Sequence, residues 1–340
     1  MKICFITDLF HPKTGGQFSS ISQICLQLKK NKVEHIILHQ QSKILSNKYL
    51  LKKTLIKYDI FHFFGGWTFF HLKLSLLALK MNKKIIVHPM GFYEPWALNH
   101  KKIKKKIAWY LYQKKLLLSA DLIHCASIRE QDNLLKLDNR FKTIVLPFGV
   151  DDNFIKKKNN KKFKKRALFF SRLHKVKGLF ELINAWQEID DKEWTLDVVG
   201  EGEEKNYLKK IVSRKKNTKI KFLDPIFNSD DKIKLFDQYD LFILPTKSEN
   251  FGISILESLA RGVPVLTTNN TPWKNIKKRN AGWVINKVDT ELKLSLIKIF
   301  QLNKRFFLIK SKNCIQLAKK FKWSVIFGQY LKVYKSLINH

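Results

Sequence analysis

Two glutamates, Glu249 and Glu257, have seven residues between them and stand around the pair Phe251 and Gly252. The apolar run 241–244 before them predicts a buried strand, and the run after Gly252 predicts a helix. A carboxylate accepts hydrogen bonds from paired sugar or ribose hydroxyls, and the free amides at a helix start suit a phosphate. The stretch therefore predicts a nucleotide-sugar site. The alternative is that Glu249 caps the helix and Glu257 faces water.

Two further loops carry residues suited to the same ligand. Arg172 and Lys177 follow a strand-like run and precede a helical one, so they form an anion site near a helix start or are two solvated cations. Gly200 and Gly202 follow another strand and allow close approach of a ligand, or simply form a tight turn. They are no dinucleotide fingerprint, because Lys205 stands where that pattern needs a third glycine.

The elements that must position these loops are strands alternating with helices. Such alternation predicts parallel sheets with helices on both faces, and ligands then sit at the carboxyl ends of the strands. The helical patterns include 19–30, 72–80 and 103–119 in the first half, and 178–186, 203–214, 230–238, 253–261 and 291–301 in the second. The strand-like runs are 2–7, 35–39, 60–64, 84–88, 122–125 and 143–146, then 167–171, 195–199, 220–222, 241–244 and 264–267.

We therefore expect an α/β protein with two Rossmann-like domains that face each other across a cleft. The first domain would span residues 1–153, and the lysine- and asparagine-rich segment 154–166 would be a linker. The donor-binding domain would follow at 167–320, and a helix over 321–340 would cross back to the first domain. The four cysteines are scattered, which fits a reduced cytoplasmic protein.

The formal net charge of +37 raises the question of nucleic acid as a partner. The excess is spread evenly, since the first 160 residues carry 28 basic and 10 acidic side chains and the remainder 37 and 18. Biased composition explains such a spread, and it speaks against a focused nucleic-acid site. The segment 99–118 predicts a helix with Ile103, Ile107, Tyr110 and Leu111 on one side and lysines around them. Such a helix either lies on anionic lipid or packs, solvated, on its own domain. No apolar run reaches the ~18 residues of a membrane span.

Together these motifs resemble the retaining glycosyltransferases of family 4 (group 1), which have the GT-B fold. The resemblance covers essentially the whole chain. It rests on "SRLHKVKG", similar to the Arg–Lys diphosphate motif, and on "SENFGISILESLARGVPVLTT", similar to the E-x7-E motif. "FHPKTGG" resembles the glycine loop near the donor phosphates. "NTPWKNI", "AGWVI" and "EPWALNHKKIKKKIAWYLYQ" resemble the branch that builds bacterial surface polysaccharides.

The resemblance implies a role for each motif. Arg172 and Lys177 would neutralise the departing diphosphate, and this electrostatic stabilisation would contribute most to the rate. Glu249 would hold hydroxyls of the donor sugar, and Glu257 those of the ribose. No metal or other cofactor is expected, because the sequence has no Asp-x-Asp motif and the two cations take the metal's place. The remaining donor contacts would come from Phe251, Gly252 and Ile253 through their amides, from Gly200, and from Gly15 and Gly16 of the first domain.

The sequence departs from the family pattern on the acceptor side. Met90 stands before Gly91 where His or Arg is usual, and His88 lies two residues earlier. His62 is kept, but Phe64 stands where a second histidine is common. His62, His88 and Met90 are therefore the candidates that would face the acceptor. The alternative for both histidines is a place in the core.

The leading prediction is an enzyme that moves a hexose from a nucleoside diphosphate sugar to a growing, lipid-linked saccharide, with retention at the anomeric carbon. It would work in cell-surface polysaccharide or lipopolysaccharide synthesis, in the cytoplasm or on the inner face of the plasma membrane. The alternatives are another GT-B activity, such as a nucleotide-sugar epimerase, and a basic nucleic-acid-binding protein. The sugar, the base, the acceptor and the oligomeric state are left open.

Overall fold

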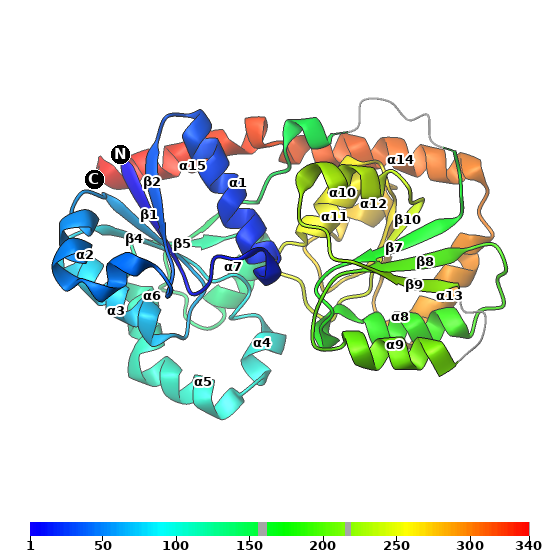
Figure 1. Cartoon of the computed structure of the whole chain (residues 1–340), viewed down its shortest axis with the longest axis horizontal. Coiled ribbons are helices and arrows are strands. Elements are labelled where there is room, and N and C mark those ends of the chain that lie inside the picture. The colour runs from blue at the N-terminus through cyan, green and yellow to red at the C-terminus, as the bar shows by residue number, and fades with distance from the viewer. Residues whose placement is uncertain (156–161, 215–218, 340) are drawn as a thin grey trace. The chain divides into compact units, whose positions relative to one another are not determined.

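The computed structural model describes residues 1–155, 162–214 and 219–339. The chain divides into two compact units, one formed by Met1–Gly149 with Trp323–His340 and the other by Val150–Lys322 (Figure 1). Each unit is a parallel sheet with helices, so the prediction of an α/β protein with two Rossmann-like domains is confirmed. Of the predicted linker 154–166, positions 156–161 lie outside the described residues.

The first unit is built on a six-stranded sheet, as far as the described residues show, in the order β2-β1-β3-β4-β5-β6. Its central strands are mostly apolar and buried on both faces, as a parallel sheet between helices requires; all five residues of β3 are buried, and all but His62 are apolar. Because β1 lies between β2 and β3, the direction of winding reverses at β1 and β3. The strands are β1 (Lys2–Thr7), β2 (Glu34–Leu38), β3 (Ile60–Phe64), β4 (Lys84–His88), β5 (Leu122–Cys125) and β6 (Thr143–Val145).

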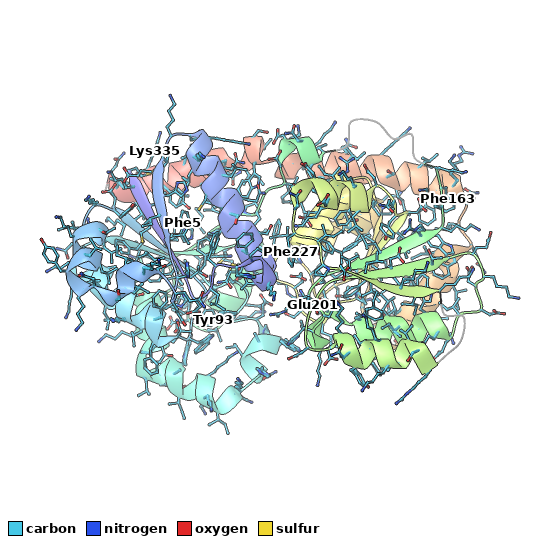
Figure 2. All side chains as sticks on the ribbon, viewed as in Figure 1. Phe5, Tyr93, Phe163, Glu201, Phe227 and Lys335 are labelled. Carbon is cyan, nitrogen blue, oxygen red and sulfur yellow. The ribbon has the colours of Figure 1, made fainter. Side chains whose placement is uncertain are left out.

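The C-terminal helix α15 (Trp323–Ile338) belongs to this first unit. Tyr330 and Tyr334 of α15 are fully buried, whereas Lys335 points outward and Phe5 of β1 lies inside the unit (Figure 2). The chain's last helix therefore completes the core of the first sheet. The other helices are α1 (Gly16–Lys30), α2 (Lys48–Leu55), α3 (Phe69–Lys80), α4 (Pro95–Asn99), α5 (Lys102–Ala108), α6 (Lys114–Ser119) and α7 (Ile128–Leu135).

The predicted helix 103–119 is divided by a π-helical segment. Five residues, Trp109–Gln113, form this segment between α5 and α6. A π turn shifts the faces of the helix, so Gln113 is buried while Tyr110 and Leu111 are 73% and 74% exposed. Across the described residues, no helix has both the length and the apolarity needed to cross a bilayer.

The second unit has the strand order β12-β11-β10-β7-β8-β9. From β7 the chain winds outward to β9 and then returns to β10 on the other side of β7, so the winding reverses between β7 and β10. The strands are β7 (Arg166–Phe170), β8 (Thr195–Val199), β9 (Ile220–Leu223), β10 (Leu241–Leu244), β11 (Val265–Thr268) and β12 (Gly282–Ile285). The helices are α8 (Leu179–Gln187), α9 (Lys205–Arg214), α10 (Ser229–Phe236), α11 (Ile253–Ala260), α12 (Asn275–Lys278), α13 (Val288–Phe300) and α14 (Lys304–Ala318).

Candidate functional site

The candidate donor residues lie at the carboxyl ends of the strands of the second unit. The loops 171–178 and 245–252 follow β7 and β10, which are neighbours at the reversal of winding. Ligands of open parallel sheets bind at this kind of position. The loop 200–204 follows β8, on the other side of β7. The sheet thus brings together the three loops that the sequence singled out.

Backbone contacts join the β7 and β10 loops directly. Gly178, with φ of 71°, begins α8, and a Cβ there would lie 2.1 Å from the carbonyl oxygen of Pro245. The carbonyl of Val176 accepts hydrogen bonds from the amide of Lys247 at 2.7 Å and from the hydroxyl of Thr246 at 3.0 Å. Only glycine permits this approach, and the approach fixes the position of Lys177.

Lys177 and Glu249 form an ion pair across these two loops. The Nζ of Lys177 lies 2.5 Å from Oε2 of Glu249, and the side chains are 14% and 13% exposed. A partly buried pair is screened less by solvent than a surface pair, so the attraction between its charges is stronger. The pair holds a cation and a carboxylate side by side at the reversal point, so the alternative of a solvated loop cation does not hold for Lys177.

Arg172 lies in the same loop but is not part of this pair. Its side chain is exposed and makes no hydrogen bond or ion pair with any residue in the described ranges. The neighbouring His174 caps the short helix Lys175–Lys177 through its Nδ1, 3.2 Å from the amide of Val176. Burial, followed by the charge of Arg172, lowers the pKa of His174. Arg172 therefore presents a cation that is available to an anionic ligand.

Glu257 is held by a residue that the sequence analysis did not single out. On α11, Glu257 is 7% exposed, so the alternative that it faces water as a surface residue is excluded. Its Oε1 accepts a hydrogen bond of 2.8 Å from the Nζ of Lys232, which lies on α10. No spacing could reveal this partner, because the two residues are 25 positions apart and lysine is frequent throughout the chain.

The start of α11 is fixed by aromatic packing beneath it. Gly252 precedes the helix with φ of 82°, a conformation that favours glycine. Phe251 is buried against Trp273, whose indole Nε1 donates a hydrogen bond to the carbonyl of Phe251. Trp273 in turn packs on Phe321 at 5.0 Å between ring centroids. The amides at Gly252 and Ile253 therefore stand on a rigid base at the helix start, as an anion site requires.

Close backbone packing explains why glycine stands at positions 200 and 202 after β8. A Cβ on Gly200 would lie 2.0 Å from the carbonyl oxygen of Ser171, and one on Gly202 would lie 2.2 Å from that of Leu173. Both have φ above 150°. Close packing of the β8 loop on the β7 loop is thus sufficient to require them. The role of Gly200 in contacting the donor stays a prediction.

The first unit places its glycine loop after β1. Gly15, with φ of 64°, precedes α1, and a Cβ there would meet open space, so the backbone conformation alone favours glycine. Gly16 is the first residue of α1. Gln17 follows, and its amide nitrogen donates to the hydroxyl of Thr7 at 2.7 Å. The loop lies at the reversal of winding of the first sheet, beside the end of β3.

The predicted acceptor-side histidines lie inside the first unit. His62 is 1% exposed and His88 0% exposed, and the ring of each packs on that of His124. Nδ1 of His62 lies 3.0 Å from the hydroxyl of Tyr334, and Nδ1 of His88 lies 2.6 Å from the carbonyl oxygen of His124. This geometry favours the core alternative for both histidines. Burial, together with the charges of its histidine neighbours, lowers the pKa of each ring, so both are neutral at pH 7.

Met90 takes a different position from the two histidines. It has φ of 57° in the loop after β4 and is half-buried. The following amide, of Gly91, donates a hydrogen bond of 2.8 Å to Oε1 of Glu130 on α7. Glu130 also accepts from the amide of Ala126 at 2.7 Å. The loop that carries Met90 is therefore tied to α7, and its relation to an acceptor stays a prediction.

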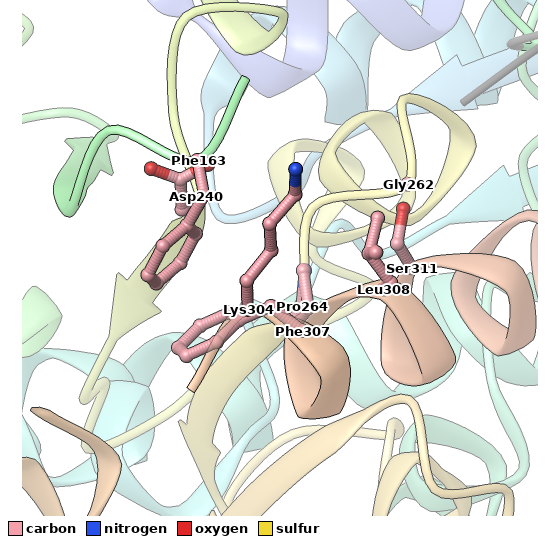
Figure 3. A pocket seen from close by; sticks show the side chains of 8 residues that line it. All are labelled: Phe163, Asp240, Gly262, Pro264, Lys304, Phe307, Leu308 and Ser311. Carbon is pink, nitrogen blue, oxygen red and sulfur yellow. The ribbon is translucent and has the colours of Figure 1, made fainter. Parts of the chain in front are cut away.

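A small pocket in the second unit lies at the end of the strands opposite to the candidate donor residues. Asp240 and Pro264 stand directly before β10 and β11, so the pocket is at the amino ends of the strands. Figure 3 shows these residues together with side chains of α14, such as Lys304 and Phe307, in the lining of the pocket. The pocket is separate from the loops that carry Lys177 and Glu249. Its lining is Phe163, Asp240, Gly262, Pro264, Lys304, Phe307, Leu308 and Ser311.

The sequence of this chain matches a known family and several known proteins. A family model described as "Glycosyl transferases group 1" matches residues 150–321. The O-antigen biosynthesis glycosyltransferase WclY of Escherichia coli is 28% identical over 233 residues, which are 64% of this chain and 63% of WclY.

Solved structures share the fold at low sequence identity. Sucrose-phosphate synthase of Thermosynechococcus elongatus has a TM-score of 0.82 and 14% identity, covering 100% of this chain and 99% of that enzyme. HepE of Anabaena, solved in complex with UDP-glucose, has a TM-score of 0.79 and 18% identity, covering 99% and 100%. At these identities the likeness shows a common fold.

Proposed function

Because the chain belongs to the glycosyl transferases group 1, we propose that it transfers a hexose from a nucleoside diphosphate sugar to a growing, lipid-linked saccharide. The product would be a cell-surface polysaccharide or lipopolysaccharide, in keeping with the O-antigen role in the name of WclY. The anomeric configuration would be retained, and no metal ion would be needed. One observation carries the proposal, namely the Lys177–Glu249 pair beside Arg172 where the winding of the sheet reverses.

The charges at this position suit the departure of a diphosphate. As the glycosidic bond breaks, negative charge grows on the leaving diphosphate, and fixed cations stabilise that charge without reorganising. Lys177 is held by its loop contacts, and Arg172 is exposed beside it. Oε2 of Glu249 is 2.5 Å from Lys177, so a donor sugar bound there would meet the carboxylate as its phosphate meets the amine. Lys177 would then exchange part of its contact with Glu249 for the diphosphate.

The test is a screen of nucleotide sugars with the full-length protein. UDP-glucose, UDP-galactose, UDP-N-acetylglucosamine and GDP-mannose would be tested by saturation-transfer NMR and calorimetry, followed by release of the nucleoside diphosphate. We expect binding of at least one donor, slow hydrolysis without acceptor, and loss of hydrolysis in Lys177→Ala. If none of the four bound, or if Lys177→Ala hydrolysed a bound donor like wild type, the proposal would fail.

We further propose that the enzyme works in the cytoplasm, docked on the inner face of the plasma membrane through α5 and the segment after it. The side chains of Ile103, Ile107, Tyr110 and Leu111 are 77%, 56%, 73% and 74% exposed. Ile103 and Ile107 lie on α5 and Tyr110 and Leu111 on the π-helical segment after it, and the exposed Lys102, Lys104 and Lys106 lie among them. An apolar face with lysines around it matches an anionic lipid surface in both hydrophobicity and charge.

Vesicle sedimentation tests this docking surface. Each lysine near an anionic surface contributes about 1 kcal/mol, so replacing Lys102, Lys104 and Lys106 by Gln should weaken binding to phosphatidylglycerol vesicles about 100-fold. A matched control replaces three exposed lysines of the second unit, Lys312, Lys319 and Lys320, and should leave binding nearly unchanged. Equal binding to neutral phosphatidylcholine vesicles, or equal losses in both triple variants, would refute docking through α5.

A further inference from the structure

Lys232 is a cation in the donor half that no motif explains. It lies on α10, and its Nζ is 2.8 Å from Oε1 of Glu257 on α11. The lysine side chain is 13% exposed and the glutamate side chain 9%. Lys234, two residues further along α10, has a side chain that is 77% exposed. The enclosed position of Lys232 is therefore a property of this residue, and surface lysines of the same helix do not share it.

Lys232 is held in place by an aromatic ring at the end of β7 and by its own helix. Its Nζ lies 5.7 Å from the centre of the Phe170 ring, at the end of β7, which is within the range of a cation–π contact. Phe170 packs edge-on against Phe236 of α10 at 5.8 Å. The start of α10 is capped by Asn228, whose side-chain oxygen accepts from the amide of Asp230 at 2.8 Å. The amine is thus directed at Glu257 by a fixed helix and a fixed ring.

The two oxygens of the Glu257 carboxylate differ in their hydrogen bonding. Oε1 accepts from Lys232, whereas Oε2 has no hydrogen-bond partner among the residues that the structure describes. Burial of an unpaired carboxylate would be strongly unfavourable, so the lysine offsets that cost and sets the plane of the group. A fixed carboxylate with one open oxygen can accept a hydrogen bond from a ligand hydroxyl in one orientation.

We propose that Lys232 is a positioning residue that aims Glu257 at the ribose of the donor and so makes the site select ribonucleotides. The inference rests on the proposed function and on the role that the family resemblance implies for Glu257, which is to hold the ribose hydroxyls. Lys232 acts through Glu257 and does not touch the reacting atoms. Its loss would affect ground and transition states alike, so the donor KM should rise while kcat changes little.

The experiment compares ribose and deoxyribose ligands on the full-length protein. Whichever of UDP, GDP, ADP and CDP binds most tightly is measured by calorimetry beside its 2′-deoxy and 3′-deoxy analogues. Wild type should bind the ribonucleotide at least tenfold tighter than one of these analogues. Lys232→Met should lose most of this discrimination, Lys232→Arg should restore part of it, and Lys234→Met should behave as wild type.

Further variants cover the case in which Lys232→Met does not fold, and they test whether Lys232 and Glu257 act together. Lys232→Gln retains a hydrogen-bond donor and serves if Lys232→Met does not fold, as judged by circular dichroism. Combining Lys232→Met with Glu257→Gln should weaken binding no more than Glu257→Gln alone, because both changes remove one interaction. Retained discrimination in Lys232→Met, additive effects, or an equal loss for ribose and deoxyribose ligands would overturn the proposal.

These outcomes also separate the inference from the proposed function. If none of the four nucleotides bound to wild type, the glycosyltransferase proposal itself would fail. If the nucleotide bound and Glu257→Gln discriminated against deoxyribose like wild type, only the role of Lys232 and Glu257 would be refuted.

Discussion

Acid should destabilise the first unit through its buried histidines, and replacing His124 should reduce this effect by a predictable amount. His124 is fully buried, and burial lowers its pKa from the ordinary 6.5 to about 4. In the unfolded chain the same ring binds a proton near pH 6.5. Below that pH the unfolded state binds more protons than the folded state. The contribution of the neutral His124 ring to the free energy of unfolding is therefore fully present above pH 6.5 and is lost as the pH falls towards 4.

The magnitude follows from these two pKa values. By pH 5 the loss from His124 amounts to about 2 kcal/mol. The pKa values of His62 and His88 are also lowered by burial, so each ring adds a loss in the same direction. The loss of about 2 kcal/mol from His124 alone is already a considerable fraction of the 5–15 kcal/mol typical of a folded domain.

Urea unfolding at fixed ionic strength between pH 5 and pH 7.5 measures this loss. His124→Gln should show an acid-induced loss smaller by about 2 kcal/mol, whatever its stability at pH 7.5. The exposed His100 supplies the control, and His100→Gln should match wild type. If His124→Gln and wild type lost the same free energy on acidification, the rings would not be buried and neutral. The acceptor-facing alternative for His62 and His88 would then regain support.

Three further predictions concern the donor half. Glu249→Gln should mainly lower kcat and Arg172→Ala should lower it by about 10²–10³, since the charges that each meets grow in the transition state; wild-type turnover in both folded variants would contradict these roles. Turnover should survive excess EDTA because Arg172 and Lys177 take the place of a divalent cation, and activity that disappears until magnesium is added would refute this. Gly200→Ala should destabilise the protein by more than about 1 kcal/mol in thermal unfolding, because its Cβ would lie 2.0 Å from a carbonyl oxygen. Gly328→Ala on α15, where a Cβ meets open space, should be neutral or stabilising, and equal effects of the two substitutions would count against the packing argument.

The architecture could be predicted from the sequence because each buried parallel strand is a short apolar run. The run 241–244 became β10, and the helix expected over 253–261 became α11, ending one residue earlier at Ala260. The periodicity did not mark β12, although its stretch "AGWVI" was among those that resemble the family. Its middle residues, Trp283 and Val284, are only half-buried, so this edge strand lacks the continuous apolar pattern of the central ones.

The site could be predicted by residue but not by contact. Lys177 and Glu249 were both expected in it, yet nothing in the sequence joins them, because their contact depends on how Gly178 and Pro245 bring two loops together. The partner of Glu257 was unpredictable for a similar reason, since one lysine among many is selected only by the packing of α10 on the sheet. Long-range pairs of common residues are a product of the tertiary fold.

The placement of α15 has a consequence for how the protein is made. Residues 1–149 leave the ribosome first, but the buried tyrosines that cover His62 and His124 are at positions 330 and 334, close to the end of the chain. At ~5–20 residues per second, the remaining 190 or so residues take roughly 10–40 s to synthesise. During this time the nascent first sheet lacks one of its covering helices. Helix α15 of the first unit is therefore made only after the whole second unit, and we expect a truncation within the final turns of α15 to expose the histidine-lined core to water.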